Sequence, residues 1–284
     1  KISPLREPRL HSQGDSLNNP SIGFIGAGNM ASSLIKGLLA KGFGRDSIAA
    51  SDIDTEKLQQ LQRDSGIRIA SNQELTDSAD VLVLAVKPQI LKAVCEGFSL
   101  GTNRPLVVSV AAGVTLDNLA AWLGNDVAIV RSMPNTPALI GKGATGLYAN
   151  AHASEQHRKI ATELMNAVGL SVWVDSESEI DAVTAVSGSG PAYYFLFMEA
   201  MQEAALELGL APEVARTLCQ QTAIGACELA NSSADDVAEL RRKVTSPGGT
   251  TEQAILTFES GGLRQLVKES LLAARDRSEE LAKE

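Results

Sequence analysis

A short glycine-rich segment has the residue types and spacing that phosphate binding requires. Residues 26–31 read Gly-Ala-Gly-Asn-Met-Ala and directly follow the apolar run 22–25. In this G-x-G-x-x-A pattern the first glycine permits a tight turn, the second lets the backbone approach a pyrophosphate, and the alanine allows a helix to pack closely on a strand. Backbone N–H groups and the helix dipole supply the positive potential. We expect the pyrophosphate of a dinucleotide at Gly26, Ala27, Gly28, Asn29 and Met30; an ordinary strand-to-helix turn is the alternative.

An acidic residue follows the second predicted strand. Asp52 lies 24 residues after Gly28. An acid in this place normally binds the ribose hydroxyls of the adenosine and disfavours a 2′-phosphate. Asp52 therefore argues for NADH, or at least against strict NADPH specificity, and a simple turn residue is the alternative.

Two more strand ends are expected in the same crevice, because ligands of open parallel sheets bind beyond the carboxyl ends of the strands. Small residues there allow a flat ring to lie on the backbone, and Lys87 either reaches the cofactor or stays solvated. The segment 131–137, after another strand, offers Asn135 and Thr136 to a nicotinamide or a substrate, or else forms a rigid turn. The two strand ends comprise Ala85, Val86, Lys87 and Pro88, and Ala111 and Ala112.

A second glycine-containing segment suits a carboxylate. Residues 245–253 read Thr-Ser-Pro-Gly-Gly-Thr-Thr-Glu-Gln. Thr250 and Gln253 match a capping box, which predicts that a helix begins here. The two glycines can form a concave row of N–H groups, and Thr251 keeps its hydroxyl free. We expect substrate binding rather than capping alone, because an ordinary cap does not need adjacent glycines.

Histidine is missing from these segments, which limits the chemistry. Reduction of a ketone leaves an alkoxide that needs a proton donor, usually His, Lys or Tyr. His11, His152 and His157 lie elsewhere, and Tyr193 and Tyr194 are interpreted as core residues. A cyclic imine is protonated before hydride addition, so no anion forms. The protein then has to hold hydride donor and acceptor about 3–3.5 Å apart, and a threonine hydroxyl suffices to orient the nitrogen.

The arrangement of predicted elements places these segments in two domains. From residue 21 to about 175, short apolar runs alternate with helical patterns, which is typical of a parallel sheet covered by helices. One helix is predicted to begin after the N-cap Asp54 and to end near Gly66. The predicted strands are 22–25, 48–51, 81–86, 105–110, 127–131, 144–149 and 170–174.

From Ile180 onward the sequence shows only alanine-rich helical stretches, such as 191–208 and 212–229. The predicted fold class is α/β, with an N-terminal Rossmann-type dinucleotide-binding domain followed by an all-helical dimerisation domain. Residues 1–20 are expected to be a flexible leader, residues 21–177 the first domain, and residues 178–284 the second.

The first long helix of the second domain has apolar residues on more than one side. One small domain cannot bury them all, so we expect a partner subunit to cover them in a homodimer. These residues are Tyr194, Phe195, Leu196, Phe197, Met198 and Met201.

Composition excludes several classes of protein. The chain has 284 residues, 44% of them hydrophobic, enough for two domains of about 100–200 residues each. Its net charge of −9 gives no basic surface for a nucleic acid. The longest clean apolar run, 81–86, is far shorter than the ~20 residues of a membrane span. Neither a nucleic-acid nor a membrane partner is expected.

The three cysteines, Cys95, Cys219 and Cys227, lie among apolar or helix-forming neighbours without C-x-x-C spacing. This usage favours buried free thiols in a reducing compartment, and hence the cytoplasm, over disulfides or a metal cluster. No metal site is expected.

Six segments together resemble one enzyme family, pyrroline-5-carboxylate reductase. The resemblance runs in order from about residue 22 to 275. It implies reduction of 1-pyrroline-5-carboxylate to L-proline, the last step of proline biosynthesis, with NADPH or NADH. It also implies a dimer through interlocking helical domains, and in many members a ring of dimers. The segments are GFIGAGNMA (23–31), AVKP (85–88), SVAAGVTLD (109–117), RSMPNTPA (131–138), AVTAVSGSGPAYYF (182–195) and VTSPGGTTEQAI (244–255).

Carried over by position, the resemblance places Asn72 along the nucleotide, together with residues 85–88 and 111–112. It places the substrate carboxylate on Ser246, Gly248, Gly249, Thr250 and Thr251, with the Thr251 hydroxyl beside the ring nitrogen; Ser246 and Thr251 are the expected catalytic residues. Two positions depart from the family pattern. Asp52 stands where NADPH-using relatives often have a neutral residue, and Lys243 replaces a neutral amide and is able to face a cofactor phosphate.

Two other functions remain open on the sequence. One is a reductase for another cyclic imino acid, such as the six-membered homologue, because the sequence does not measure ring size. The other is a non-catalytic NAD(P)-sensing dimer, which gives no reason for the N–H-rich segment with Thr251.

Overall fold

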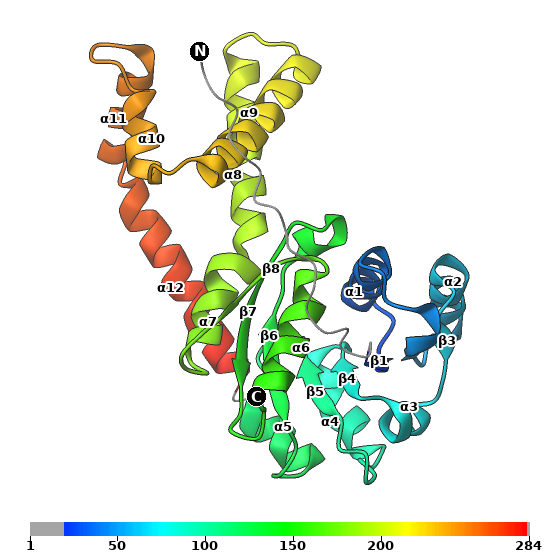
Figure 1. Cartoon of the computed structure of the whole chain (residues 1–284). Coiled ribbons are helices and arrows are strands. Elements are labelled where there is room, and N and C mark those ends of the chain that lie inside the picture. The colour runs from blue at the N-terminus through cyan, green and yellow to red at the C-terminus, as the bar shows by residue number, and fades with distance from the viewer. Residues whose placement is uncertain (1–19, 283–284) are drawn as a thin grey trace, which may run out of the picture.

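The structure, a computed structural model, describes residues 20–282. The expected leader, apart from Pro20, lies outside the described residues, as does His11. A sheet with helices on both of its faces forms one end of the molecule, and a group of long helices projects from it (Figure 1).

The sheet has eight strands in the order β3-β2-β1-β4-β5-β6-β7-β8. The first six strands are parallel, β7 is antiparallel to β6, and β8 is parallel to β7. The strands are β1 (Ile22–Ile25), β2 (Ile48–Ser51), β3 (Arg68–Ile69), β4 (Val81–Leu84), β5 (Leu106–Ser109), β6 (Ile129–Met133), β7 (Gly143–Ala149) and β8 (Gly169–Trp173).

All seven predicted strands are present, with ends that differ by up to two residues. Strand β3 was missed because it has only two residues, both exposed. The parallel arrangement predicted from the alternation holds for β1 to β6 but not for β7. A parallel crossover needs a dozen or more residues. Residues 134–142, between β6 and β7, are too few, so the chain turns back antiparallel.

Helices cover both faces of the sheet. One core cluster packs α1, α2 and α6 on one face, and a second packs α3, α4 and α5 on the other. Leu34 and Leu38 of α1 are fully buried, and each contributes about 1.5–3 kcal/mol. These helices are α1 (Asn29–Ala40), α2 (Thr55–Ser65), α3 (Asn72–Ser78), α4 (Pro88–Glu96), α5 (Leu116–Leu123) and α6 (Glu155–Asn166), with short 3-10 helices η1 (Arg45–Ser47) and η2 (Thr136–Ile140).

The predicted ends of α2 are confirmed. Asp54 is its N-cap and its Oδ1 accepts a hydrogen bond from the N–H of Lys57 at 3.0 Å. This hydrogen bond lowers the pKa of Asp54. Gly66 closes the helix in the left-handed conformation at φ +73°, which a glycine adopts without strain.

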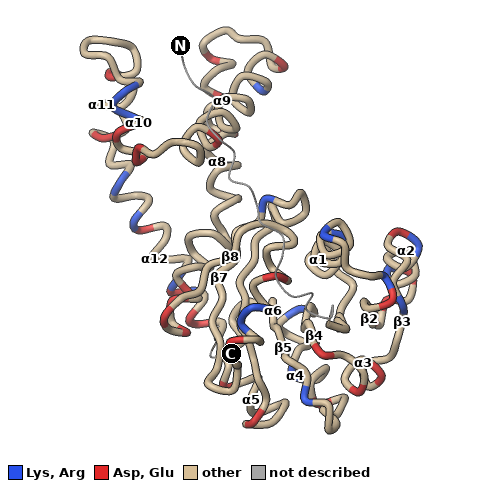
Figure 2. Tube along the Cα trace, viewed as in Figure 1, with Lys and Arg blue, Asp and Glu red and all other residues tan. Residues whose placement is uncertain are grey.

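After β8 the described chain is helical. Helices α8 and α12 are the two long connections to the far end of the molecule (Figure 1). The first part of α8 carries no charged residue (Figure 2). The elements are α7 (Glu179–Val183), the π-helix η3 (Thr184–Gly188), α8 (Gly190–Glu207), α9 (Pro212–Ser232), α10 (Val237–Lys243), α11 (Thr250–Ser260) and α12 (Leu263–Leu281).

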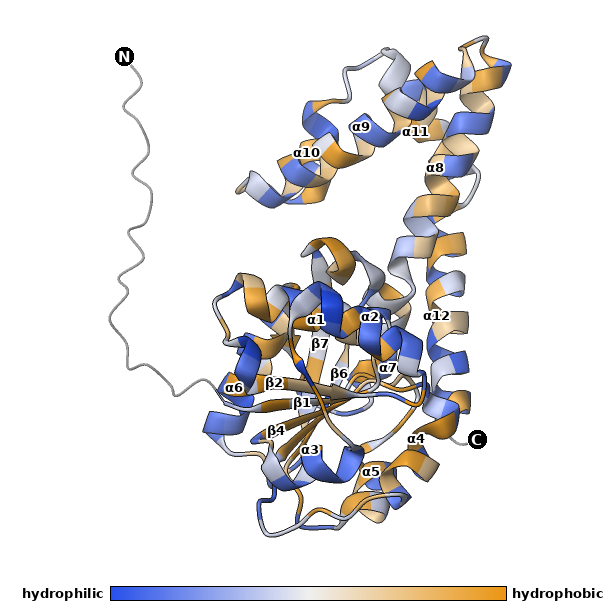
Figure 3. Cartoon of the chain, turned by 90° about the vertical axis from the view of Figure 1, so that its right-hand side faces the viewer, coloured by the Kyte–Doolittle hydropathy of each residue, from blue (hydrophilic) through white to orange (hydrophobic). Residues whose placement is uncertain are grey.

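The projecting helices expose much apolar surface, as predicted (Figure 3). On α8, Phe195 and Leu196 are 61% and 65% exposed. The interpretation of Tyr194 as a core residue is wrong for a single chain, since it is 64% exposed. Cys227 on α9 is exposed too, whereas the prediction of a buried free thiol is confirmed for Cys95 and Cys219. Burial raises the pKa of Cys95 to about 12.

The last helix returns to the sheet. Ser278 of α12 donates its hydroxyl to Oδ1 of Asp181 on α7 at 2.7 Å, and both residues are buried. Leu281 packs against Gly113, in the turn after β5. The projecting helices are therefore fixed to the sheet at two places, through α7 with η3 and through the end of α12.

Residues 20–282 contain neither a candidate membrane span nor a candidate metal site. No helix there combines the length and apolar character that a membrane span requires. No three His, Cys, Asp or Glu side chains in that range group together as a metal site would require.

Candidate active site

The fold places the glycine-rich segment where the strand order reverses. Strand β1 lies between β2 and β4, and ligands of open α/β sheets bind at such a point, beyond the carboxyl ends of the strands. The N–H of Gly26 donates to the carbonyl of Ser51 at 2.8 Å, and the N–H of Ala85 donates to the carbonyl of Ile25 at 2.8 Å. The turn after β1 is thus attached to the ends of both neighbouring strands.

The two glycines of this turn are needed for different reasons. Gly26 has φ +107°, and a Cβ there would stand 2.5 Å from the carbonyl oxygen of Ala85. Gly28, the N-cap of α1, has an ordinary φ of −72°, and a Cβ there would meet no atom within 4 Å. The first turn of α1 has no acidic side chain and no side-chain cap, so its N–H groups are available to an anion. This space fits a pyrophosphate.

Asp52 is engaged with the backbone of this turn. Its Oδ2 accepts from the N–H of Ala27 at 2.7 Å, and its Oδ1 accepts from the N–H of Asp54 at 2.9 Å. The sequence suggested a ribose ligand, and the structure adds that Asp52 also holds the glycine-rich turn against the end of β2. Ile53, beside it, is 93% exposed.

Other predicted nucleotide contacts lie around the same strand ends. Asn72 is the first residue of α3, and its Oδ1 accepts from the hydroxyl of Ser51 at 2.5 Å. Residues 85–88 follow β4, where Lys87 is the exposed N-cap of α4 and forms no ion pair with any acid in residues 20–282. Residues 111–112 follow β5. The sheet therefore brings together all the segments expected to bind the nucleotide.

The role of Arg131, which is buried within β6, was not apparent from the sequence. Its Nη1 donates to Oε1 of Glu177 at 2.7 Å, and the same oxygen accepts from the N–H of Leu116 at 2.7 Å. This ion pair ties β6 to the start of α5 and to the segment before α7. A basic residue in a buried strand does indicate a hidden acid, but the sequence does not identify which acid.

Asn135 is not free to meet a ligand. Its amide donates to the carbonyl of Ser187 at 2.9 Å and accepts from the N–H of Ala144 at 2.9 Å, and the residue is 9% exposed. These bonds favour the alternative, a rigid turn, over a contact with nicotinamide or substrate. The neighbouring Thr136 is exposed.

The second glycine-containing segment differs from its predicted form. Gly249, not Thr250, is the N-cap of α11, and no side chain caps this helix. The predicted capping box is wrong because Thr250 already has helical conformation. Instead, Oε2 of Glu252 accepts from the N–H of Gly248 at 2.7 Å, and the N–H of Gly249 donates to the carbonyl of Ser246 at 3.0 Å.

The N–H groups that remain for a ligand are those of the first turn of α11. Residues 250–252 precede the first intrahelical hydrogen bond, so their N–H groups have no carbonyl partner in the helix. The side chains of Ser246 and Thr251 are exposed. The first turn of α11, at its N-terminus, therefore offers a carboxylate more free N–H groups than the two glycines do.

One chain does not bring the two N–H-rich sites together. The turn between α10 and α11 lies at the far end of the projecting helices, away from the sheet (Figure 1). The hydrogen bonds of residues 245–252 within the described chain stay inside α10, α11 and the turn itself. The expectation of Thr251 beside the nucleotide crevice is not met within a single subunit.

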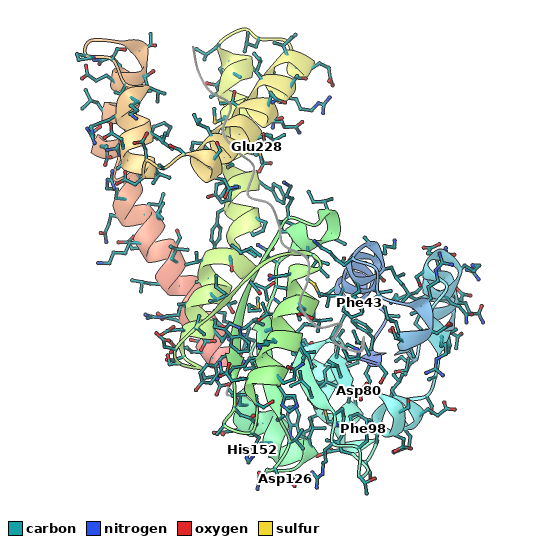
Figure 4. All side chains as sticks on the ribbon, viewed as in Figure 1. Phe43, Asp80, Phe98, Asp126, His152 and Glu228 are labelled. Atoms are coloured by element: carbon teal, nitrogen blue, oxygen red, sulfur yellow. The ribbon has the colours of Figure 1, made fainter. Side chains whose placement is uncertain are left out.

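The two histidines within residues 20–282 lie away from both sites. His152 is in the turn after the antiparallel β7, at the edge of the sheet opposite the carboxyl ends of β1 to β6 (Figure 4). Ser154 is the N-cap of α6, His157 completes the capping box by accepting from the N–H of Ser154, and burial lowers the pKa of His157. Lys243, which was considered for a cofactor phosphate, forms an ion pair with Asp235 and lowers the pKa of that carboxyl group.

Comparisons with known proteins agree with this arrangement. The family pattern "Pyrroline-5-carboxylate reductase dimerisation" matches residues 177–281, and the pattern "NADP oxidoreductase coenzyme F420-dependent" matches residues 21–113. A pyrroline-5-carboxylate reductase of Pseudomonas aeruginosa is 51% identical over 94% of this chain and 99% of its own length. The chain belongs to the pyrroline-5-carboxylate reductase family.

Solved structures of this family have the same fold. The pyrroline-5-carboxylate reductase of Coxiella burnetii is 46% identical, covers 94% of this chain and all of its own, and superposes with a TM-score of 0.90. The Plasmodium falciparum enzyme, solved with NADP bound, is 28% identical, covers 94% of this chain and 100% of its own, and has a TM-score of 0.81. Both superpositions include the sheet and the projecting helices.

Proposed function

We propose that this chain reduces 1-pyrroline-5-carboxylate to L-proline, the last step of proline biosynthesis, with NADH or NADPH as hydride donor. The observation that carries this proposal is the pair of N–H-rich helix ends: the open space at Gly28 before α1 and the first turn of α11. One suits a pyrophosphate and the other a carboxylate.

The chain's own groups have simple roles in this reaction. The turn at residues 26–30 and the start of α1 hold the pyrophosphate, with Asn72 and residues 85–88 and 111–112 along the nucleotide. The first turn of α11 binds the substrate carboxylate. The reduced nicotinamide supplies the hydride when it is bound. A protonated ring nitrogen donates to the hydroxyl of Thr251, which orients the C=N bond, and Ser246 lines the same turn.

Two subunits are needed to complete this site. The turn before α11 lies away from the crevice of its own chain, and the exposed apolar face of α8 requires a cover. We infer that the homodimer places the α11 turn of one subunit at the crevice of its partner. Association of dimers into a ring is an extension of this proposal and rests on the family resemblance.

The two parts of the chain have different roles. We propose residues 21–177 as the dinucleotide-binding domain and residues 178–284 as the substrate and dimerisation domain, and the cytoplasm as the location, in keeping with three free cysteines.

Steady-state assays with both cofactors test the function. Consumption of NADH and of NADPH is followed with 1-pyrroline-5-carboxylate and, in parallel, with the six-membered homologue. We expect turnover with the five-membered ring at the higher kcat/KM. A higher kcat/KM for the six-membered ring would reassign the substrate. Cofactor binding without consumption would indicate a sensor.

A further inference from the structure

The junction between the sheet and α8 is a π-helix. In η3, the N–H of Ser189 donates to the carbonyl of Thr184 at 2.8 Å, a spacing of five residues. The hydroxyl of Thr184 donates a hydrogen bond to the carbonyl of Ile180, and the hydroxyl of Ser187 donates one to the carbonyl of Val183. Such side-chain bonds bend helices, and single π-turns occur frequently at functional sites. This turn is where the chain leaves the sheet.

Pro191 deprives this junction of one hydrogen bond. In a regular helix the carbonyl of Ser187 would accept from the N–H four residues later, but residue 191 is a proline and has no N–H. The next donor is occupied as well, since the N–H of Ala192 donates to the carbonyl of Ser189 at 3.0 Å. The backbone of η3 and α8 therefore leaves the carbonyl of Ser187 without a partner.

Asn135 supplies the missing donor from a different element. Its Nδ2 lies 2.9 Å from the carbonyl oxygen of Ser187, and its Oδ1 lies 2.9 Å from the N–H of Ala144 at the start of β7. The two partners fix the orientation of the amide, because a carbonyl needs the NH2 group and an N–H needs the oxygen. The amide satisfies both partners at once, which a carboxylate does not.

The end of β6 and the π-helix are in direct contact beside this amide. A Cβ added to Gly188 would stand 2.5 Å from Cε of Met133, the last residue of β6. A Cβ added to Gly146 of β7 would stand 2.7 Å from the side chain of Val183. The strands and the junction therefore touch beside the amide, and a change in the amide contact is expected to shift the start of α8.

We propose that Asn135 is a positioning residue: its side-chain amide replaces the hydrogen bond that Pro191 removes and so sets the direction in which α8 leaves the dinucleotide crevice. Asn135 follows β6, whose carboxyl end lies at the same edge of the sheet as the dinucleotide crevice, and α8 leads to the helices that carry the α11 turn. This inference rests on the proposed function, since it links the cofactor site to the placement of the substrate turn.

A double-mutant cycle with Asn135→Asp and Pro191→Ala tests the hydrogen bond without cofactor or substrate. The carboxylate introduced by Asn135→Asp would keep the acceptor for Ala144 but lose the donor to Ser187. Urea unfolding is expected to show about a tenfold loss in the folding equilibrium constant for Asn135→Asp. The loss should shrink to about twofold or less in the Pro191→Ala background, where an N–H at residue 191 serves the carbonyl. Equal losses in the two backgrounds would overturn the proposed compensation.

Kinetics on the same four proteins test the positioning role. For Asn135→Asp we expect kcat with 1-pyrroline-5-carboxylate to fall about tenfold or more, while the Kd for NADH from fluorescence titration stays within about twofold. Pro191→Ala should restore stability to Asn135→Asp but not kcat, because the link to β6 is still absent. Recovery of kcat together with stability, or an unchanged kcat, would make Asn135 merely structural.

Two safeguards keep these outcomes separate. If Asn135→Asp does not fold, Asn135→Ala takes its place: Pro191→Ala should remove only part of its stability loss, because the N–H of Ala144 still lacks its acceptor. If the wild-type protein does not turn over 1-pyrroline-5-carboxylate, the proposed function fails, whereas the stability cycle still decides whether Asn135 compensates for Pro191.

Discussion

At the scale of single residues, the two glycines of the turn after β1 are required for different reasons. Gly26 is required by the protein itself, because its φ is +107° and a side chain would collide with the backbone at Ala85. Gly28 is not required by the protein, since its φ is ordinary and its surroundings are open. We propose that the need for Gly28 comes from the ligand.

Gly28→Val should therefore separate binding from folding. The side chain fills the pyrophosphate space, and losing two charge-assisted hydrogen bonds of about 1.5–3 kcal/mol each weakens NADH binding by about 100-fold or more. Thermal unfolding should change little. Gly26→Ala is the matched control and should lower the Tm. Normal NADH affinity in Gly28→Val would place the pyrophosphate elsewhere.

Asp52 combines a charge effect with a structural one. Asp52→Ser removes a negative charge near the expected 2′-position and should raise the NADPH/NADH ratio of kcat/KM on the order of tenfold. Because the N–H of Ala27 also loses its partner, NADH affinity should fall as well.

Asp52→Asn isolates the charge, since its amide oxygen still accepts from Ala27. The two variants are compared by steady-state kinetics with each cofactor. An unchanged ratio in both would mean that Asp52 serves only to hold the turn.

At the scale of elements, local signals predicted which segments form helices and strands, but not how they are joined. Asp54 and Gly66 bound α2 as expected because caps depend on neighbours within four residues. Thr250 failed as a cap because α11 begins one residue earlier than predicted: Gly249 is the N-cap, and its carbonyl accepts from the N–H of Gln253. Long-range pairs such as Arg131 with Glu177, or Asn135 with Ser187, cannot be predicted from residue spacing, because they produce no periodic pattern in the sequence.

The ion pair of Arg131 is expected to carry considerable stability. The Arg131 side chain is 4% exposed and that of Glu177 is 28% exposed. Glu177→Gln leaves the buried guanidinium without its counter-charge and should lower the free energy of unfolding by about 3 kcal/mol, the low end of such changes because Glu177 is partly solvated.

Urea unfolding measures this loss. Glu179→Gln, a nearby exposed acid, is the control. A loss below about 0.5 kcal/mol, the range of ordinary surface substitutions, would show that the pair contributes little.

At the scale of the whole molecule, the separation of the α11 turn from the crevice makes a dimer part of the chemistry. Gly28→Val disables the crevice of a subunit, and Thr251→Ala disables its α11 turn. Each variant alone should be nearly inactive, with Thr251→Ala still binding NADH. If each site combines two subunits, a mixed dimer contains one intact site.

Co-refolding the two variants in equal amounts should therefore restore about a quarter of wild-type activity, since half of the dimers are mixed and each has one of two sites. The activity of each variant refolded alone is the baseline. No gain above that baseline would mean that each site is built from a single chain.

From the sequence alone one could derive the glycine-rich turn after β1, a helix beginning near residue 250, the strand-helix alternation and the apolar excess on α8. These follow from contacts between near neighbours and from the balance of apolar and polar residues. Only the tertiary structure decided that Asp52 holds the turn, that Asn135 faces inward to Ser187, and that Thr251 lies away from its own crevice. Such contacts join residues far apart in the chain, and their partners are selected by packing of the whole fold rather than by any repeat in the sequence.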